Sequence, residues 1–357
     1  MNILDDLDRI KIIDREDMLG VEENFHSQLL QAREIVKKSD LEQLRKKEFK
    51  GIVFLGMGGS GFAGNIIKAL IKDDIEIPVE IVKGYDLPAF IKNGWLAVAV
   101  SYSGNTEETI SAVGQALDRG CEVLPVCSGG KLENIAVENN KAMIKIPPGL
   151  QPRGAIGYLF LPPYLALDKL DIITVDGGDM EEALDLIEKK AGLYKREVES
   201  ERNPAKKLAL KISGHLPIIY GTEGLLAAVS YRLKCEFNEN SKTPCWCNEF
   251  PELNHNETVG WERLKDITKK FILLVFRDKD EGIRVKTRIE VTSDLIKENI
   301  SAVIEIPVEG KSKLAKALST IYLGDIASVY LALLSGVDPS PVEKIVILKG
   351  ELKKLDK

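Results

Sequence analysis

The stretch Gly56-Met57-Gly58-Gly59-Ser60-Gly61 directly follows the apolar run Ile52-Val53-Phe54-Leu55. A second apolar run, from 96 to 100, ends in Ser101-Tyr102-Ser103-Gly104-Asn105-Thr106. Each run is typical of a strand that opens into a turn of glycine and small hydroxyl residues. Neither turn contains lysine or arginine, so an anion bound there would be held by backbone N–H groups, helix N-termini and hydroxyls. The two turns together predict a pocket for a phosphate group.

Around these turns, apolar strand-like runs alternate with segments of helical periodicity. We expect strands at 52–56, 79–83, 96–101, 122–127 and 142–146, and helices at 61–72, 106–119 and 131–138. Continuous apolar strands that alternate with helices indicate a parallel sheet covered on both faces. Ligands of such sheets bind at the carboxyl ends of the strands, which is where both turns lie.

The second half of the chain repeats this pattern. We expect a strand that begins near His215 and opens into a glycine turn at 221–224. Further strands are expected at 271–276 and 302–307, and helices at 314–334 and 342–355. Helical segments at 15–38 and 180–202 complete the pattern. The sequence thus predicts an N-terminal domain over 1–155 with leading helices, a helical connection over 156–200 and a C-terminal domain over 201–357. The helix at 314–334 is apolar on more than one face, which is typical of a core or an interface.

Composition restricts the class of protein. The 357 residues are 44% hydrophobic and 29% charged, a balance typical of soluble globular proteins. A net charge of −6 argues against general binding of nucleic acid, which needs a basic face. No apolar stretch is expected to reach the length of a membrane span. The acidic N-terminus lacks a signal-peptide pattern, so we expect a cytoplasmic protein.

The cysteines and histidines form no recognisable disulfide or metal pattern. Five cysteines, an odd number without a secretion signal, do not indicate a disulfide framework. Cys245-Trp246-Cys247 has no second Cys or His pair at zinc spacing, and the three histidines share no short motif. We therefore expect free thiols and no metal.

Gly56-x-Gly58-x-x-Gly61 also matches the fingerprint of dinucleotide-binding folds. The next strand of that fold ends in an acidic residue that holds the ribose, whereas here it ends in Lys83-Gly84. Lys83 could instead accept the 2′-phosphate of NADP, which leaves this alternative open. Ser60 and the serine-rich second turn fit a single phosphate better than a pyrophosphate. Either turn alone could also be a plain connection between strand and helix.

The two turns together resemble the sugar isomerase (SIS) domain. Further segments resemble the bifunctional phosphoglucose/phosphomannose isomerases of archaea and some bacteria: Gln151-Pro152-Arg153-Gly154, Phe237-Asn238-Glu239-Asn240, Pro251-Glu252-Leu253-Asn254-His255-Asn256-Glu257 and, near the C-terminus, Lys349. The resemblance covers most of the chain and implies two SIS-like, doubly wound parallel-sheet (flavodoxin-like) domains. It also implies an isomerase of carbohydrate metabolism, in glycolysis and gluconeogenesis, without a cofactor.

The resemblance assigns a role to each matching residue. The residues that match the sugar-phosphate clamp are Gly58, Gly59, Ser60, Ser101, Ser103 and Thr106. Arg153 matches an arginine over the reacting carbons, and Glu239 matches the catalytic base. His255 matches a histidine that helps to open the sugar ring across the interface of a homodimer, whose two subunits share the active site. Lys349 matches a lysine that assists ring opening, and Ser340 a small hydroxyl residue that leaves room for both epimers. Other lysines near that position are Lys344, Lys353 and Lys354.

Aldose–ketose isomerisation asks for the same residue types. A carboxylate such as Glu239 can move a proton between C1 and C2 through a cis-enediol, and it does so best when burial brings its pKa toward neutrality. A fixed cation such as Arg153 would stabilise the enediolate charge, and His255 could move the ring-oxygen proton. No step requires a metal. Judged alone, a glutamate is more often a solvated surface group and a histidine a structural one. The runs Lys206-Lys207 and Lys353-Lys354 are typical of solvated helix faces.

We therefore expect a cytoplasmic, metal-free isomerase that interconverts glucose 6-phosphate or mannose 6-phosphate with fructose 6-phosphate at a site between the domains. The main alternative is a non-catalytic SIS protein that binds sugar phosphates, but the sequence shows no helix-turn-helix to convert binding into regulation. Another alternative is an amino-sugar isomerase module, which would normally need a glutaminase domain with a nucleophilic cysteine near the N-terminus. We expect neither nucleic acid nor a membrane as a partner.

Overall fold

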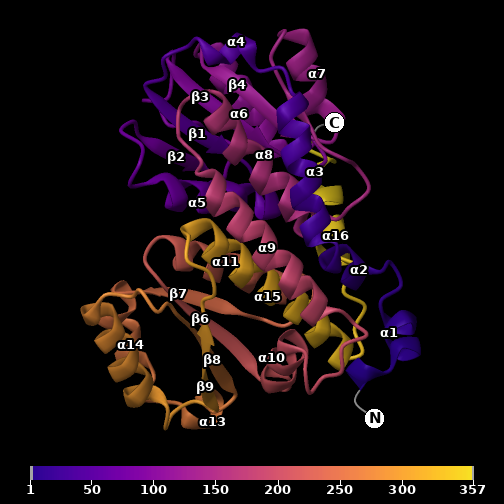
Figure 1. The fold of residues 1–357 in the computed structure, drawn as a ribbon, viewed down its shortest axis with the longest axis vertical. Coiled ribbons are helices and arrows are strands. Elements are labelled where there is room, and N and C mark those ends of the chain that lie inside the picture. The colour runs from indigo at the N-terminus through magenta and orange to yellow at the C-terminus, as the bar shows by residue number, and fades with distance from the viewer. Residues whose placement is uncertain (1–2, 356–357) are drawn as a thin grey trace.

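The computed structural model describes residues 3–355, which form two parallel sheets with helices on both sides of each (Figure 1). The first sheet has the strand order β2-β1-β3-β4-β5, and the second has the order β7-β6-β8-β9. All neighbouring strands run parallel. The order of the first sheet is that of flavodoxin-like doubly wound folds. The predicted α/β class with two doubly wound parallel sheets is confirmed.

The strands are β1 (Gly51–Leu55), β2 (Val79–Val82), β3 (Trp95–Val100), β4 (Glu122–Cys127), β5 (Ile144–Lys145), β6 (Leu216–Thr222), β7 (Trp246–Phe250), β8 (Phe271–Arg277) and β9 (Ala302–Pro307). The helices as far as residue 194 are η1 (Ile3–Asp5), α1 (Leu7–Ile13), α2 (Met18–Glu23), α3 (Phe25–Lys38), α4 (Glu42–Arg45), α5 (Gly58–Ile71), α6 (Glu107–Asp118), α7 (Gly130–Glu138), η2 (Pro152–Ala155), α8 (Ile156–Lys169) and α9 (Gly177–Tyr194). The later helices are α10 (Pro204–Ile212), α11 (Leu225–Glu239), η3 (Glu252–His255), α12 (Glu257–Gly260), α13 (Lys265–Thr268), α14 (Ile283–Ile296), α15 (Lys313–Leu334) and α16 (Glu343–Leu352).

Alternate residues of each central strand enter different cores, as the two-residue period of a strand requires. In β1, Ile52 and Phe54 join the large core with α5, whereas Val53 and Leu55 join a separate core with α6. In β8, Leu274 faces the large core and Leu273 faces a third core with α14. The large core thus contains one face of each sheet, so the two halves share a single apolar interior.

The longest helix, α15, lies at the centre of this shared core. It packs against α9, α10 and α11 and also contacts α2 and α5. By length and composition it could cross a membrane, so the expectation that no apolar stretch has that length is wrong. In the structure, 89% of its apolar window is buried inside the protein, and α15 is a core helix.

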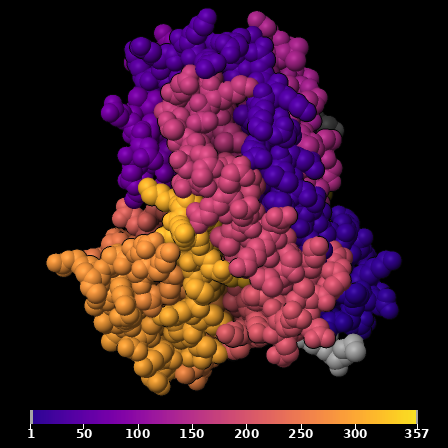
Figure 2. All heavy atoms as spheres, viewed as in Figure 1, coloured from indigo at the N-terminus to yellow at the C-terminus, as the bar shows by residue number. Residues whose placement is uncertain are grey.

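The N-terminal segment lies along both halves of the molecule, as the indigo spheres in Figure 2 show. Helix α3 packs against α8, whereas α2 and η1 contact α15. The backbone N–H and the hydroxyl of Ser200 both donate to Asp5, each at 2.8 Å. The boundaries predicted at 155 and 200 stay a prediction.

Several elements differ from those expected. The helix predicted over 15–38 is two helices, α2 and α3. The sequence analysis missed α10, α14 and β7; β7 is an edge strand with polar residues in its middle, so no apolar run indicates it. Lys206 is buried rather than solvated, because its ammonium donates to Asp5 and to the carbonyl of Arg196. Lys207, Lys353 and Lys354 are exposed, as expected.

Candidate active site

The first glycine turn joins β1 to the N-terminus of α5. Helix α5 begins at Gly58, and no side chain caps its first turn. A Cβ at Gly61 would lie 2.4 Å from the carbonyl oxygen of Gly56, so only glycine lets the helix approach the strand this closely. The first backbone N–H groups of a helix lack intrahelical partners, and such N–H groups are suited to bind an anion.

The second turn lies against the first. The Ser60 hydroxyl accepts a hydrogen bond from the backbone N–H of Tyr102 at 3.2 Å, which leaves its own proton available to an anion. The hydroxyls of Ser101 and Thr106 are 2.9 Å apart and hydrogen-bonded. Gly104 has φ +66°, and a Cβ there would overlap the carbonyl of Gly129, so this position needs glycine. Ser103 is exposed at the same turn. The structure therefore brings the predicted clamp residues to one place.

Arg153 lies beside the clamp, in η2. A Cβ at Gly59 would stand 3.1 Å from the carbonyl oxygen of Pro152, which places the start of α5 against η2. The Arg153 side chain is only 2% exposed. Its Nη2 donates to the carbonyls of Pro339 and Ser340, each at 2.8 Å. The chain near the C-terminus thus holds the arginine next to the first turn.

Glu239 meets Arg153 from the other side. Glu239 is the last residue of α11. Its Oε2 lies 3.6 Å from Nη1 of Arg153, and its side chain is 29% exposed. Ser340 is buried, and its hydroxyl has no hydrogen-bond partner among the described residues. Glu239, Arg153 and Ser340 therefore form one group beside the two turns.

Lys242 is a further residue of this group, which the sequence analysis missed. Its ammonium donates to the carbonyl of Glu239 at 2.5 Å and to that of Pro339 at 2.8 Å. Burial and the nearby Arg153 lower the pKa of Lys242 to about 8. Its position three residues after the predicted base is the only signal that the sequence offered.

A buried cluster of charges lies behind the group. Arg232 of α11 pairs with Glu236 at 3.0 Å and with Asp325 of α15 at 2.6 Å, and all three side chains are 2% exposed. Burial raises the pKa of both carboxyl groups, although Arg232 opposes that shift. Glu22 of α2 is also buried, and burial together with Asp325 raises its pKa to about 8. Glu22 is thus largely protonated at neutral pH.

Replacing Glu22 with glutamine should remove a pH dependence of stability. The folded protein binds a proton at Glu22 that the unfolded chain, with its ordinary pKa of 4.5, releases. Stability from this group is therefore complete below pH 4.5 and is lost as the pH rises toward 8. We expect wild type to lose on the order of 2–4 kcal/mol more than Glu22→Gln between pH 5 and pH 8. Denaturant unfolding at both pH values measures this difference.

The neighbouring Glu23, which pairs with Arg196 at 2.9 Å, provides the control. Glu23→Gln should keep the wild-type trend with pH. If Glu22→Gln and wild type show the same trend, then Glu22 is ionised in the folded protein and the assignment is wrong.

His255 and Lys349 lie apart from the group. His255 is exposed on η3, and Lys349 is exposed on α16. Within residues 3–355, neither forms a hydrogen bond or ion pair with Arg153 or Glu239. Helix α16 has no buried residue, and its apolar run from Ile345 to Leu348 is 40–65% exposed. One chain by itself therefore leaves both residues outside the group.

The other sequence alternatives concern Lys83, the cysteines and metals. The ammonium of Lys83 lies 4.4 Å from the centre of the Tyr231 ring, so it is engaged by α11. All five cysteines are free thiols in the structure. In the described part of the chain, no three His, Cys, Asp or Glu side chains gather in a way that could hold a metal ion.

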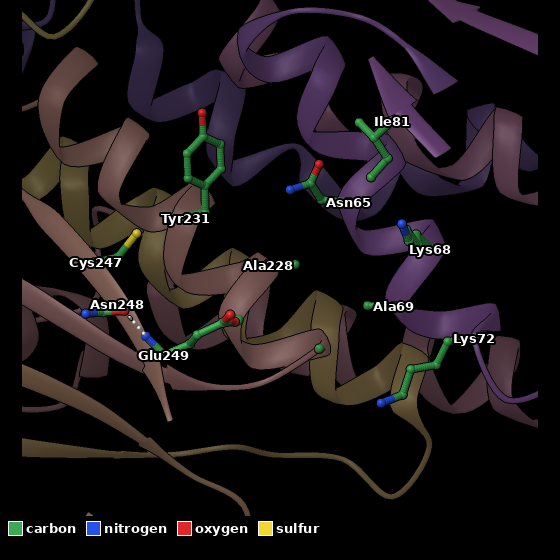
Figure 3. Close-up of a pocket in the computed structure, with 12 residues that line it drawn as sticks. Asn65, Lys68, Ala69, Lys72, Ile81, Ala228, Tyr231, Cys247, Asn248 and Glu249 are labelled. Atoms are coloured by element: carbon green, nitrogen blue, oxygen red, sulfur yellow. Dashed lines mark hydrogen bonds between the residues drawn. The ribbon is translucent and has the colours of Figure 1, made fainter. Parts of the chain in front are cut away.

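A hollow of about 460 Å³ lies elsewhere, between α5, β2, α11 and β7 (Figure 3). Tyr231 and Cys247 lie on one side of it and Lys68 and Ile81 on the other. Its residues on α5 and α11 come from the opposite ends of these helices to Ser60 and Glu239. None of its described lining residues belongs to the predicted site.

Comparison with known proteins places the chain among sugar-phosphate enzymes. Residues 44–168 match the family model of the SIS domain, and residues 201–352 match that of the bacterial phospho-glucose isomerase C-terminal SIS domain. The bifunctional phosphoglucose/phosphomannose isomerase of Caldicellulosiruptor bescii is 40% identical over 332 residues, which cover 93% of this chain and 98% of that protein. The protein of the same name from Aquifex aeolicus is 38% identical over 308 residues, which cover 86% and 91%.

A solved structure supports the fold alone. The crystal structure of a hypothetical protein from Thermus thermophilus has a TM-score of 0.72 with this chain. The match covers 94% of this chain and 91% of that protein, at 15% identity.

Proposed function

This chain belongs to the family of the bifunctional phosphoglucose/phosphomannose isomerases, and from that premise we infer that it is an aldose–ketose isomerase. It interconverts glucose 6-phosphate and mannose 6-phosphate with fructose 6-phosphate through a cis-enediol. The resemblance drawn from the sequence is thereby confirmed. The observation that supports a catalytic rather than a merely binding site is the Arg153–Glu239 pair beside the two turns.

We propose the following roles within one subunit. The phosphate binds at the N-terminus of α5 and to the hydroxyls of the clamp. The Glu239 carboxylate takes the proton from C2 of the aldose and returns it to C1. Nη1 of Arg153 faces Glu239, so it can stabilise the enediolate oxygens that form between these steps. The unpartnered Ser340 hydroxyl lies next to them, where it leaves room for either configuration at C2.

Ring opening requires a second copy of the chain in this proposal. His255 and Lys349 lie on exposed elements, and the apolar side chains at 345–348 of α16 are 40–65% exposed. Burial of such a helix against a partner is favourable because it removes apolar surface from water. We therefore propose a cytoplasmic homodimer in which His255 of one subunit completes the site of the other.

An assay with purified protein tests the activity. We expect incubation with fructose 6-phosphate in the presence of EDTA to yield both glucose 6-phosphate and mannose 6-phosphate. Coupled assays that are specific for each aldose measure the two products. A protein that binds fructose 6-phosphate but forms neither aldose would support the non-catalytic alternative. Activity lost with EDTA and restored by a divalent cation would contradict the metal-free prediction.

A further inference from the structure

The guanidinium of Arg153 uses its nitrogens for different purposes. Nε donates to Oδ1 of Asn240 at 2.6 Å, and Nη2 donates to the two carbonyls at 339 and 340. Only Nη1 faces Glu239. Because Nε and Nη2 are held from two directions, the plane of the guanidinium is fixed, and Nη1 is the nitrogen left for a substrate.

Asn240 is the one side chain among these acceptors, and it is fully buried. Its Nδ2 donates to Glu236 Oε2 at 3.1 Å and to the hydroxyl of Ser328 at 2.9 Å. The amide can face only one way, because a guanidinium only donates and a carboxylate only accepts. Hydrogen-bond partners thus fix both polar atoms of the Asn240 side chain, Oδ1 and Nδ2.

These bonds close a ring that returns to Arg153. Glu236 pairs with Arg232, and Nη2 of Arg232 donates to the backbone carbonyl of Arg153 at 2.8 Å. The side chain and the backbone of Arg153 are therefore tied to the same buried network. Such a network is rigid when all its members are satisfied.

The chemistry of Asn240 also keeps charges apart. All three acceptors that bond Arg153 directly are neutral, whereas the buried carboxylates of Glu236 and Asp325 pair with Arg232. A carboxylate in place of the Asn240 amide would neutralise Arg153 where an enediolate needs its charge. The amide therefore transmits position from the buried cluster without transmitting negative charge.

We infer that Asn240 is a positioning residue of the isomerase site, which holds Nη1 of Arg153 toward the reacting carbons and separates its guanidinium from the Glu236 carboxylate. This inference rests on the role proposed for Arg153. It concerns a residue that contacts Arg153 and not the substrate. Its loss should therefore affect turnover more than substrate binding.

The test compares Asn240→Ala with wild type in the fructose 6-phosphate assay. We expect kcat to fall about 10- to 100-fold, the loss of one buried hydrogen bond to a charged group, with KM changed less than about threefold because the phosphate clamp is intact. The acid limb of the kcat–pH profile should also move to lower pH, because a released Arg153 can approach Glu239. The other titratable groups around Glu239 are Lys242, Cys235 and Glu236, and the substitution removes none of them.

Asn238→Ala is the matched control, because this asparagine lies on the same turn of α11 but accepts from the backbone N–H of Cys245. It should leave kcat and the profile unchanged. If both variants lower kcat equally and the profile stays in place, Asn240 is merely structural and the inference is overturned. If Asn240→Ala does not fold, Asn240→Asp replaces it: a fall in kcat of about tenfold or more supports the inference, and an unchanged kcat overturns it.

Arg153→Gln separates this inference from the proposed function. If Arg153→Gln leaves kcat unchanged, the role proposed for Arg153 fails, and the inference about Asn240 fails with it. If Arg153→Gln lowers kcat while Asn240→Ala alters neither kcat nor the profile, only the inference about Asn240 is overturned.

Discussion

Glu239→Gln should lower turnover of fructose 6-phosphate by about two to four orders of magnitude, the range that general-base catalysis contributes. Glutamine keeps the shape of the side chain but cannot accept the proton that leaves C1 of the ketose. The clamp at 58–60 and 101–106 is untouched, so binding of the sugar phosphate should stay within a few-fold of wild type. Steady-state kinetics give kcat, and calorimetric titration gives the affinity.

Glu249→Gln is the control, because Glu249 is a partly buried carboxylate that lines the hollow in Figure 3 and not the site. We expect its turnover to equal that of wild type. Normal turnover by Glu239→Gln would exclude Glu239 as the base.

A mixture of two inactive variants, Glu239→Gln and His255→Ala, tests whether the two subunits share the active site. If His255 acts across a dimer, a heterodimer of Glu239→Gln and His255→Ala has one site with both residues intact. Turnover on the cyclic substrate should then recover after the two proteins are unfolded and refolded together. Failure to recover, with mixed dimers demonstrated by mass, would place Glu239 and His255 in the same subunit's site.

Arg232→Met should destabilise the fold by about 3–5 kcal/mol, because it leaves the carboxylates of Glu236 and Asp325 buried without their partner. Methionine replaces much of the volume, so the loss is mainly electrostatic. Protonation relieves unpaired carboxylates, so the deficit should be smaller at pH 5 than at pH 8. Denaturant unfolding at both pH values measures the free energy of unfolding.

Arg45→Met is the control for this substitution. Arg45 pairs with Glu42 and Asp171, but half of its side chain is exposed. Water screens such pairs, so we expect no measurable loss of stability. Equal stability of Arg232→Met and wild type would mean that the buried carboxyl groups are neutral in the folded protein.

The strands that position the clamp could be predicted because they are buried on both faces. All of β1 and β3 is buried, so each gives a continuous apolar run, and the turn residues follow directly. The edge strand β7 has one flank without a neighbour, and its mixture of Asn248 and Glu249 with apolar residues gave no such run.

The contacts of the site residues could not be predicted from local patterns. Glu239 and Arg153 were found by their resemblance to a family. The carbonyls that hold Arg153 lie 186 and 187 residues further along the chain, and no periodicity relates such distant positions. Lys206 was misjudged for the same reason, because its partner Asp5 lies 201 residues away.

Helix α15, which touches elements of both halves, limits how the molecule can be divided or opened. Each half contributes a sheet face to the interior around this helix. A fragment cut between 155 and 200 would expose that face to water, so neither half should be an autonomous folding unit. For the same reason the two halves cannot separate by a hinge motion around the substrate. Entry to the site must therefore depend on its surface loops and on whatever covers them.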